Sequence, residues 1–155
     1  MYFILISLFG GILSTAIMTL TEIPSWKKWG LHGVFEWHEN QEITKFLIDL
    51  SDNKKIHFGG IFFLHFLNGT LAGTAFPFII SLFTFSTIVI PLSLLGILYG
   101  FILWIVTLMP IHKAITGFSP WNHPLGHRPA LASLGGHLVY GFVLGLMTLL
   151  NKNQV

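Results

Sequence analysis

The sequence predicts an all-α protein, a four-transmembrane-helix bundle that forms a single membrane domain over residues 1–155. Three observations predict this fold. Only 9% of the residues are charged, against roughly 25% in an ordinary soluble domain. Hydrophobic residues make up 53% of the chain, and the mean hydropathy is +0.74. Long segments, among them residues 56–112, contain no Asp, Glu, Lys or Arg at all.

This composition excludes several classes of protein. A soluble domain of this length needs a charged surface, and the chain has too few charges to build one, which argues against a soluble enzyme or a disordered tail. The formal net charge of +2 is too small for a phosphate-binding surface, so we expect no nucleic-acid partner. Because there is no cysteine, disulfides, thiolate metal sites and iron–sulfur clusters are excluded.

Four segments have the length and composition of membrane spans. A helix needs about 20 mostly apolar residues to cross the hydrocarbon core. The first uncharged segment ends at Glu22, and residues 56–112 have room for two spans with a turn near Ser81–Ser86. Pro77 should bend the first of these two helices, and Pro91 fits the first turn of the next. The predicted spans are about 3–21, 58–80, 88–109 and 133–150.

The distribution of Lys and Arg predicts the orientation. Loops 22–57 and 110–132 share one side of the membrane and carry seven of the eight basic residues: Lys27, Lys28, Lys45, Lys54, Lys55, Lys113 and Arg128. The positive-inside rule therefore puts both loops in the cytoplasm and both termini outside. A cleaved signal peptide would need a basic segment before the first apolar run, and none precedes Lys27, so we expect the first span to be retained.

The two cytoplasmic loops differ in character. In the first, Ile43, Phe46, Leu47 and Leu50 recur at helical spacing, which predicts a short amphipathic interfacial helix on the membrane surface. The aromatic rings of the same loop favour the headgroup layer. These rings belong to Trp26, Trp29, Phe35 and Trp37. The second loop is rich in Pro and Gly, which forbid a long helix and predict a compact cap.

Histidines and acidic residues gather on the predicted cytoplasmic side. The eight histidines are His32, His38, His57, His65, His112, His123, His127 and His137. The six acidic residues are Glu22, Glu36, Glu39, Glu42, Asp49 and Asp52. Much of this clustering follows from where the loops are. His65 and His137 are exceptions, because they fall inside predicted spans, where ionisable residues are rare and usually face the bundle interior.

Small residues mark one face of each predicted span and allow close helix packing. The expected helix-packing positions are Gly11, Gly69, Gly73, Gly96, Gly100, Gly141 and Gly145. The same faces carry one polar group per helix toward the cytoplasmic end: Glu22, His65, His112 and His137. Imidazole with carboxylate suits a divalent transition metal, so these four are the expected metal ligands, and His123 and His127 are weaker candidates.

Two other interpretations of the same residues stay open. A haem would need two opposed imidazoles, and His65 with His137 is the natural pair for this cofactor-binding role. Alternatively, both histidines simply form hydrogen bonds between helices. Nothing in the spacing separates haem from a metal ion.

Catalytic motifs fail when they are tested, so the sequence does not favour an enzyme. The segment that begins His38-Glu39 resembles the zinc-protease motif HExxH, but Glu42 stands where the second histidine belongs. Membrane di-iron desaturases have adjacent histidine pairs, and the chain has none. Phosphate-binding loops and lipid phosphotransferase motifs are absent as well. No catalytic residue is identified.

The pattern of these motifs resembles a family of small four-helix integral membrane proteins of bacteria and archaea for which no activity is known. The resemblance rests on Gly10-Gly11 through Met18-Thr19, on Gly96 and Gly100 with Pro110, and on two histidine segments. The latter are His65-xxx-Gly69-xxx-Gly73 and His137-Leu-Val-Tyr140-Gly141-xxx-Gly145. It implies the four-helix fold and marks His65 and His137, but it implies no activity.

Two functions therefore remain. In the first, the protein binds a transition metal or haem at a cytoplasmic-side histidine site. In the second, it is a non-catalytic accessory subunit of a larger membrane complex, with the glycine faces and the aromatic loop as docking surfaces. Its partners would be the lipid bilayer together with another membrane protein or further copies of the chain.

Overall fold

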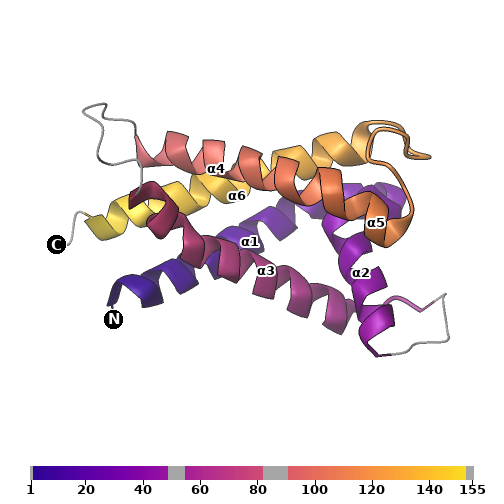
Figure 1. Cartoon of the computed structure of the whole chain (residues 1–155), viewed down its shortest axis with the longest axis horizontal. Helices are drawn as coiled ribbons and strands as arrows, with labels where there is room; N and C mark the ends of the chain where they lie inside the picture. Colours follow the sequence, from indigo (N-terminus) through magenta and orange to yellow (C-terminus); the bar gives the residue numbers. More distant parts are fainter. Residues whose placement is uncertain (1, 49–54, 82–90, 153–155) are drawn as a thin grey trace.

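A computed structural model describes residues 2–48, 55–81 and 91–152, and this part of the chain is all-helical, with no strand. The long helices are α1 (Tyr2–Trp29), α3 (Phe58–Ser81), α4 (Leu92–Thr107) and α6 (Arg128–Lys152). The shorter elements are η1 (Leu31–Gly33), α2 (Phe35–Leu47), the π-helical turn η2 (Leu108–His112) and α5 (Lys113–Thr116). Both termini lie at one end of the molecule, and α2 and α5 lie at the other (Figure 1).

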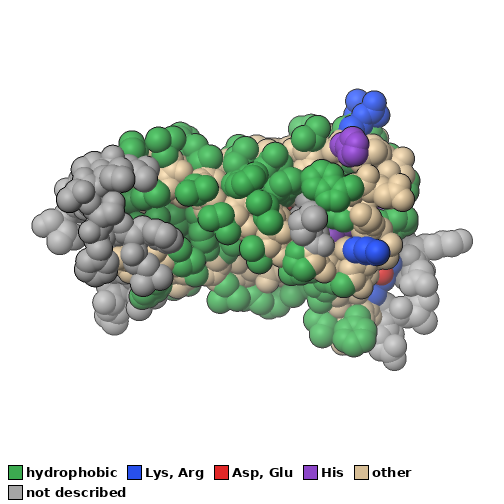
Figure 2. Space-filling view, turned by 45° about the horizontal axis from the view of Figure 1, so that its top comes forward, with side chains coloured by type: hydrophobic (Ala, Val, Ile, Leu, Met, Phe, Trp, Pro, Cys, Tyr) green, Lys and Arg blue, Asp and Glu red, His purple; other side chains and the backbone are tan. Residues whose placement is uncertain are grey.

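Four helical segments are long and apolar enough to cross a membrane, which confirms this part of the sequence prediction. They are Leu5–Trp29, Phe58–Ser81, Leu92–Thr116 and Arg128–Leu149. Hydrophobic side chains cover the middle of the molecule, whereas basic and histidine side chains gather at one end (Figure 2). We call this end the cap: η1, α2, η2, α5 and residues 117–127.

Three of the helices extend beyond the spans predicted from the sequence. Helix α1 does not end before Glu22 but continues through Pro24 to Trp29, because a helix can run on beyond the hydrocarbon core into the cap. Helix α4 continues through η2 into α5, and α6 begins at Arg128, ahead of the predicted residue 133. The predicted turn near Ser81–Ser86 lies outside the described residues from 82 on. The carbonyl of Pro91 accepts the first hydrogen bonds of α4.

Glycines bring the helices together in two seams. In the α4–α6 seam, a Cβ added at Gly96 would lie 2.1 Å from the carbonyl oxygen of Gly141, and one at Gly145 would lie 2.3 Å from that of Leu92. In the α1–α3 seam, a Cβ at Gly73 would lie 2.4 Å from the Cα of Gly11. Backbones this close have no room for a side chain, so glycine is required at these crossings. Gly69 and Gly100 have equally close neighbours, the Thr15 hydroxyl and the His137 carbonyl.

The four long helices form an open arrangement. Helix α1 packs against α3 and α6, and α6 packs against α4, whereas α3 and α4 barely meet. Figure 1 shows α3 diverging from α4 toward the cap, with α2 between them at that end. Two tyrosines hold the middle of α3 in place, because Tyr140 and Tyr99 donate hydrogen bonds to the carbonyls of Gly69 and Ala72 at 2.6 and 2.8 Å.

The position of α2 differs from the prediction that the aromatic rings of loop 22–57 lie in the headgroup layer. Phe35 and Trp37 are not in position to enter a headgroup layer, since they are 0% and 2% exposed inside the protein. Phe46 and Leu47 of the predicted apolar face are exposed, while Leu50 lies outside the described residues. The helix packs inward by its polar face because that face finds hydrogen bonds there, such as the one from Gln41 to the Lys55 carbonyl at 2.8 Å.

Candidate functional site

Helices α1, α2, α3, α4 and α6 surround a cavity of about 120 Å³ near the cap end of the bundle. Several of its wall residues are polar or ionisable, which is unusual among apolar helices. They include Glu36, Glu39, His65, Asn68, His137 and Tyr140. The walls therefore combine carboxyl, imidazole, amide and phenol groups within one space.

The first carboxyl–imidazole pair joins α1 to α3. His65 Nε2 lies 3.5 Å from Glu22 Oε2 and 3.1 Å from Thr19 Oγ1. Glu22 is only 2% exposed, and Trp37 Nε1 donates a hydrogen bond to its Oε2 at 2.8 Å. The continuation of α1 beyond the predicted boundary puts Glu22 on the inner face of a helix, one turn after Thr19.

The second pair joins α2 to α6. Glu36 Oε1 lies 3.3 Å from His137 Nδ1, and it also accepts a hydrogen bond from the Ser133 hydroxyl. His137 Nδ1 is 3.0 Å from the carbonyl oxygen of Ser133, one turn earlier in α6. Glu36 is in addition a direct electrostatic neighbour of Glu22, so the two pairs meet through their carboxyl groups.

The third pair lies between the cavity and the cap. Glu39 Oε1 is 2.8 Å from His112 Nδ1, and the His112 side chain is completely buried. His112 ends the π-helical turn η2, and such turns commonly reorient side chains at functional sites. Burial, with a smaller contribution from Glu36, raises the pKa of Glu39 to about 9. The folded structure therefore favours the protonated form of this carboxyl group at neutral pH.

The structure brings some of the predicted ligands together and separates others. Glu22 and His65 are in direct contact, and His137 reaches this pair through Glu36. His112 is paired with Glu39 instead of joining the other three. His123 is buried within the cap, whereas His127 is exposed. Among the residues that the structure describes, no three His, Asp or Glu side chains already present their donor atoms as a group that could hold a metal ion.

Sequence reasoning did not select Glu36 and Glu39 as site residues. They were attributed to a solvated loop, although their spacing of three residues places both on one face of a helix. Asn40 follows at the next position of the same face and is 4% exposed. A continuous polar face on the helix predicted for this loop was the available signal.

Only one of the two histidines in the predicted spans makes the contacts between helices that a purely structural role would require. His65 contacts Thr19 and Glu22 of α1, as the interhelical interpretation expects. His137 instead contacts the backbone of its own helix and a carboxyl group of α2.

Nothing matches the chain in comparisons with protein-family models, curated proteins and solved structures.

Proposed function

We propose that this is an integral membrane protein that binds a divalent transition metal in the cavity between its helices. The observation that carries the proposal is the pair of neighbouring carboxyl groups of buried Glu22 and half-buried Glu36, each with a histidine beside it. Glu22 Oε1 and Glu36 Oε2 are buried and have no hydrogen-bond partner. Neither carboxyl group has a Lys or Arg partner among the described residues.

The charge of this pair favours a cation. Two carboxylates side by side in a buried site cannot both be ionised unless a proton or a positive ion lies between them. A divalent ion balances both charges at once, which leaves a neutral site among apolar helices. Two carboxylates and two neutral imidazoles are a ligand set used for zinc, manganese, iron and nickel.

The surrounding hydrogen bonds suit ligands of this kind. Because the Ser133 carbonyl engages Nδ1 of His137, Nε2 is the nitrogen left for a metal. Trp37 holds one oxygen of Glu22, and Ser133 holds one oxygen of Glu36, so the second oxygen of each carboxyl group stays available. Outer hydrogen bonds that fix ligand orientation are a general feature of metal sites.

The volume of the cavity favours a metal ion over haem. Pockets for drug-sized ligands have roughly 300–1,000 Å³, and a porphyrin needs space of that order. The cavity of about 120 Å³ suits an ion with one or two waters. In this proposal Glu36 takes the place of His112 in the ligand set, while His65 and His137 keep their predicted role.

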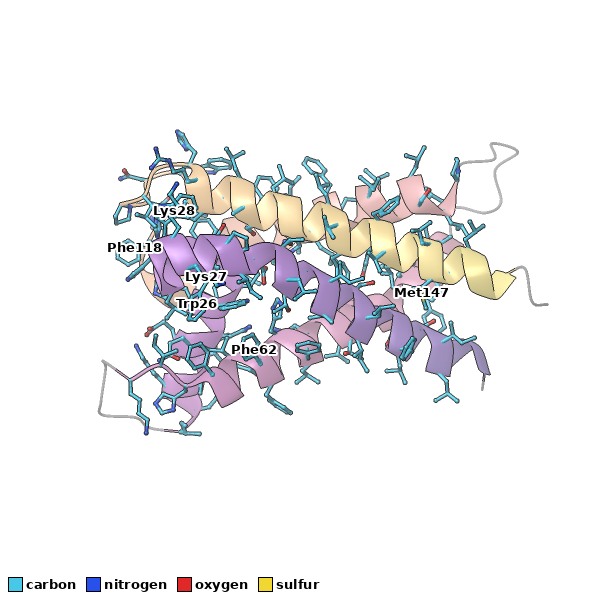
Figure 3. All side chains as sticks on the ribbon, turned by 180° about the vertical axis from the view of Figure 1, so that it is seen from behind. Trp26, Lys27, Lys28, Phe62, Phe118 and Met147 are labelled. Atoms are coloured by element: carbon cyan, nitrogen blue, oxygen red, sulfur yellow. The ribbon has the colours of Figure 1, made fainter. Side chains whose placement is uncertain are left out.

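The proposed topology puts the cap in the cytoplasm and both termini outside, in the plasma membrane of a prokaryote. The basic side chains at the cap end support this orientation (Figure 2). Trp26, Lys27 and Lys28 lie together at this end, and Met147 lies toward the other (Figure 3). The proposed metal would then be loaded from the cytoplasmic side.

Metal titration of the purified protein tests the proposal. Isothermal titration with Zn²⁺ in detergent should show an event that is lost in Glu22→Gln, Glu36→Gln, His65→Ala and His137→Ala. Glu42→Gln and His127→Ala are matched controls, because Glu42 pairs with Lys45 on the outer face of α2 and His127 is exposed. If the four site variants keep this same event with the affinity and stoichiometry of the controls, the proposal fails.

A second candidate function is that of a non-catalytic accessory subunit, and Asn68 supports it. This residue lies midway along α3, lines the cavity and is also exposed, so it marks an opening between α3 and α4. A polar side chain exposed at membrane depth is costly unless another protein covers it. A membrane-protein partner or a second copy of the chain seated there would provide that cover.

Disulfide crosslinking tests this second candidate, since the chain has no cysteine of its own. Asn68→Cys should crosslink to a partner in native membranes, and Phe63→Cys, exposed on another face of α3, should not. If Asn68→Cys gives only monomer and the protein always purifies alone in mild detergent, the accessory function is excluded.

A further inference from the structure

Four imidazoles form a closed ring in the cap, which we call the cap histidine cluster: His32, His38, His112 and His123. Successive ring centroids are 4.5 Å apart for His32 and His38, 6.0 Å for His38 and His112, 6.5 Å for His112 and His123, and 6.1 Å for His123 and His32. The four residues come from η1, α2, η2 and the loop 117–127. Only the folded cap brings them together.

Three members of the cluster have a buried nitrogen without a hydrogen-bond partner. These atoms are His38 Nδ1, His112 Nε2 and His123 Nε2. The three side chains are among the buried residues, with 5%, 0% and 5% exposure, whereas His32 is exposed. Buried polar atoms are almost always paired, so three unpaired imidazole nitrogens in one cluster require an explanation.

Burial favours the neutral imidazole of His38 and of His123. Burial lowers the pKa of His38 to about 3, with further contributions from His32 and His112. Burial and the same two neighbours, led by His112, also lower the pKa of His123. A neutral imidazole keeps a lone pair, and this is the form that binds a metal ion.

His112 has the surroundings of a metal ligand. Its Nδ1 is held at 2.8 Å by Glu39, which leaves Nε2 directed away from the carboxyl group. A carboxyl group behind a histidine in this way is the usual outer partner of a metal-binding imidazole. Phe35 packs on His112 with 4.0 Å between centroids, and Phe118 lies 5.6 Å from His123, so the cluster has an apolar enclosure. Figure 3 shows Phe118 at the cap end of the molecule.

We infer that the cap histidine cluster is a second metal site, for a borderline divalent ion such as Zn²⁺, Co²⁺ or Ni²⁺, with His38, His112 and His123 as ligands and His32 at its exposed side. On a tetrahedral ion with Zn–N bonds of about 2.0–2.1 Å, two ring centroids lie about 5 Å apart. The rings of His38 and His112 therefore have to approach by about 1 Å. His123 has to give up the weak 3.2 Å hydrogen bond that its Nδ1 accepts from the Leu125 amide.

The two metal sites differ in their donors, and this makes them separable. The cap site has nitrogen donors, whereas the proposed site between Glu22 and Glu36 has both oxygen and nitrogen donors. Glu39 lines the cavity and also contacts His112, so this carboxyl group adjoins both sites.

A Co²⁺ titration of the full-length protein in detergent tests the cap site, followed by its visible absorption and by bound stoichiometry. Wild-type protein should bind two equivalents. The double variant His38→Gln/His123→Gln should bind one, with the spectrum of the interior site, and Glu22→Gln/Glu36→Gln should bind one with the spectrum of the cap. His127→Ala, an exposed histidine of the same loop, should leave both events unchanged.

The outcomes separate this inference from the proposed function. If the cap variant binds as much Co²⁺ as the wild type with an unchanged spectrum, the cap site is refuted, whatever happens to the interior site. If the cap variant loses all Co²⁺ while the interior variant keeps one equivalent, the cap site stands and the interior site fails. Circular dichroism should show the wild-type helix signal for each variant. If the double cap variant loses this signal, His112→Gln serves as a second cap variant.

Discussion

The α4–α6 glycine seam offers a quantitative test of the fold that positions the site. Replacing Gly141 by Ala puts a methyl carbon 2.0 Å from the carbonyl oxygen of Gly96. Ordinary contact begins at about 3.4 Å, so the methyl group is about 1.4 Å too close. The contacted atom belongs to the backbone and cannot rotate away. The two helices must therefore separate, and overpacking of this kind costs roughly 1–3 kcal/mol.

Gly135 is the matched control for this substitution. It lies on the same helix, and a Cβ added there meets nothing within 4 Å. Alanine is the better helix former by about 1 kcal/mol, so Gly135→Ala should leave the free energy of unfolding unchanged or raise it. Unfolding of both variants in detergent, followed by circular dichroism, measures the difference.

Separation of α4 from α6 should also disturb the site. Gly100 packs directly on the carbonyl of His137, so the seam sets the position of that imidazole. Gly141→Ala should bind Zn²⁺ more weakly as well as unfold more easily. If Gly141→Ala is as stable as Gly135→Ala, the backbones of α4 and α6 are not in close contact at Gly141.

Three further predictions address the cap and its contacts. The pKa of Glu39 is raised in the folded protein, so its contribution to stability is complete below about pH 4.5 and is lost as the pH rises toward about 9. The melting temperature of the wild type should therefore fall over this pH range by more than that of Glu39→Gln. Equal falls in the two proteins would refute the raised pKa. Trp37→Phe leaves an oxygen of buried Glu22 without its hydrogen-bond donor, so the free energy of unfolding should fall by about 1–3 kcal/mol. Trp29→Phe is the control. If both variants lose the same stability, the contact between Trp37 and Glu22 contributes nothing. A cysteine at Asn53 should resist an impermeant thiol reagent in intact cells and react in opened ones, and labelling of intact cells would reverse the proposed topology.

Local composition was sufficient to predict the four long helices. Each has an apolar segment long enough for a membrane, and this signal does not depend on contacts made elsewhere in the chain. The ends of the helices were harder to predict. Glu22 and Pro24 break the apolar pattern, but a helix that has left the hydrocarbon core can continue through both, as α1 does.

The cap could not be predicted from local patterns, because its structure depends on contacts between distant segments. Ile43, Phe46 and Leu47 suggested that α2 lies on a membrane by its apolar face. Instead, its opposite face enters the bundle, where Asn40 donates a hydrogen bond to the carbonyl of Ile61 in α3, and Gln41 donates one to the carbonyl of Lys55, just before α3. That inward turn brings Glu36 and Glu39 to the histidines.

The predicted ligand set was incomplete for the same reason. His65 and His137 were identifiable because an ionisable residue inside an apolar span is conspicuous. Glu36 lies in a loop segment with several other charges, and nothing local distinguishes it from Glu42, which pairs with Lys45 outside the site. Its role in the proposed site depends on a packing arrangement that joins α2 to α6.

The most direct test is the metal content of the protein purified from its native membranes, measured by elemental analysis beside the Glu22→Gln/Glu36→Gln variant. The proposal predicts that the wild type carries one equivalent of a divalent transition metal more than the variant. X-ray absorption should assign to that ion nitrogen and oxygen ligands at about 2.0–2.2 Å. Equal metal content in the two proteins, or none in either after reconstitution, would contradict a metal site at the paired carboxyl groups.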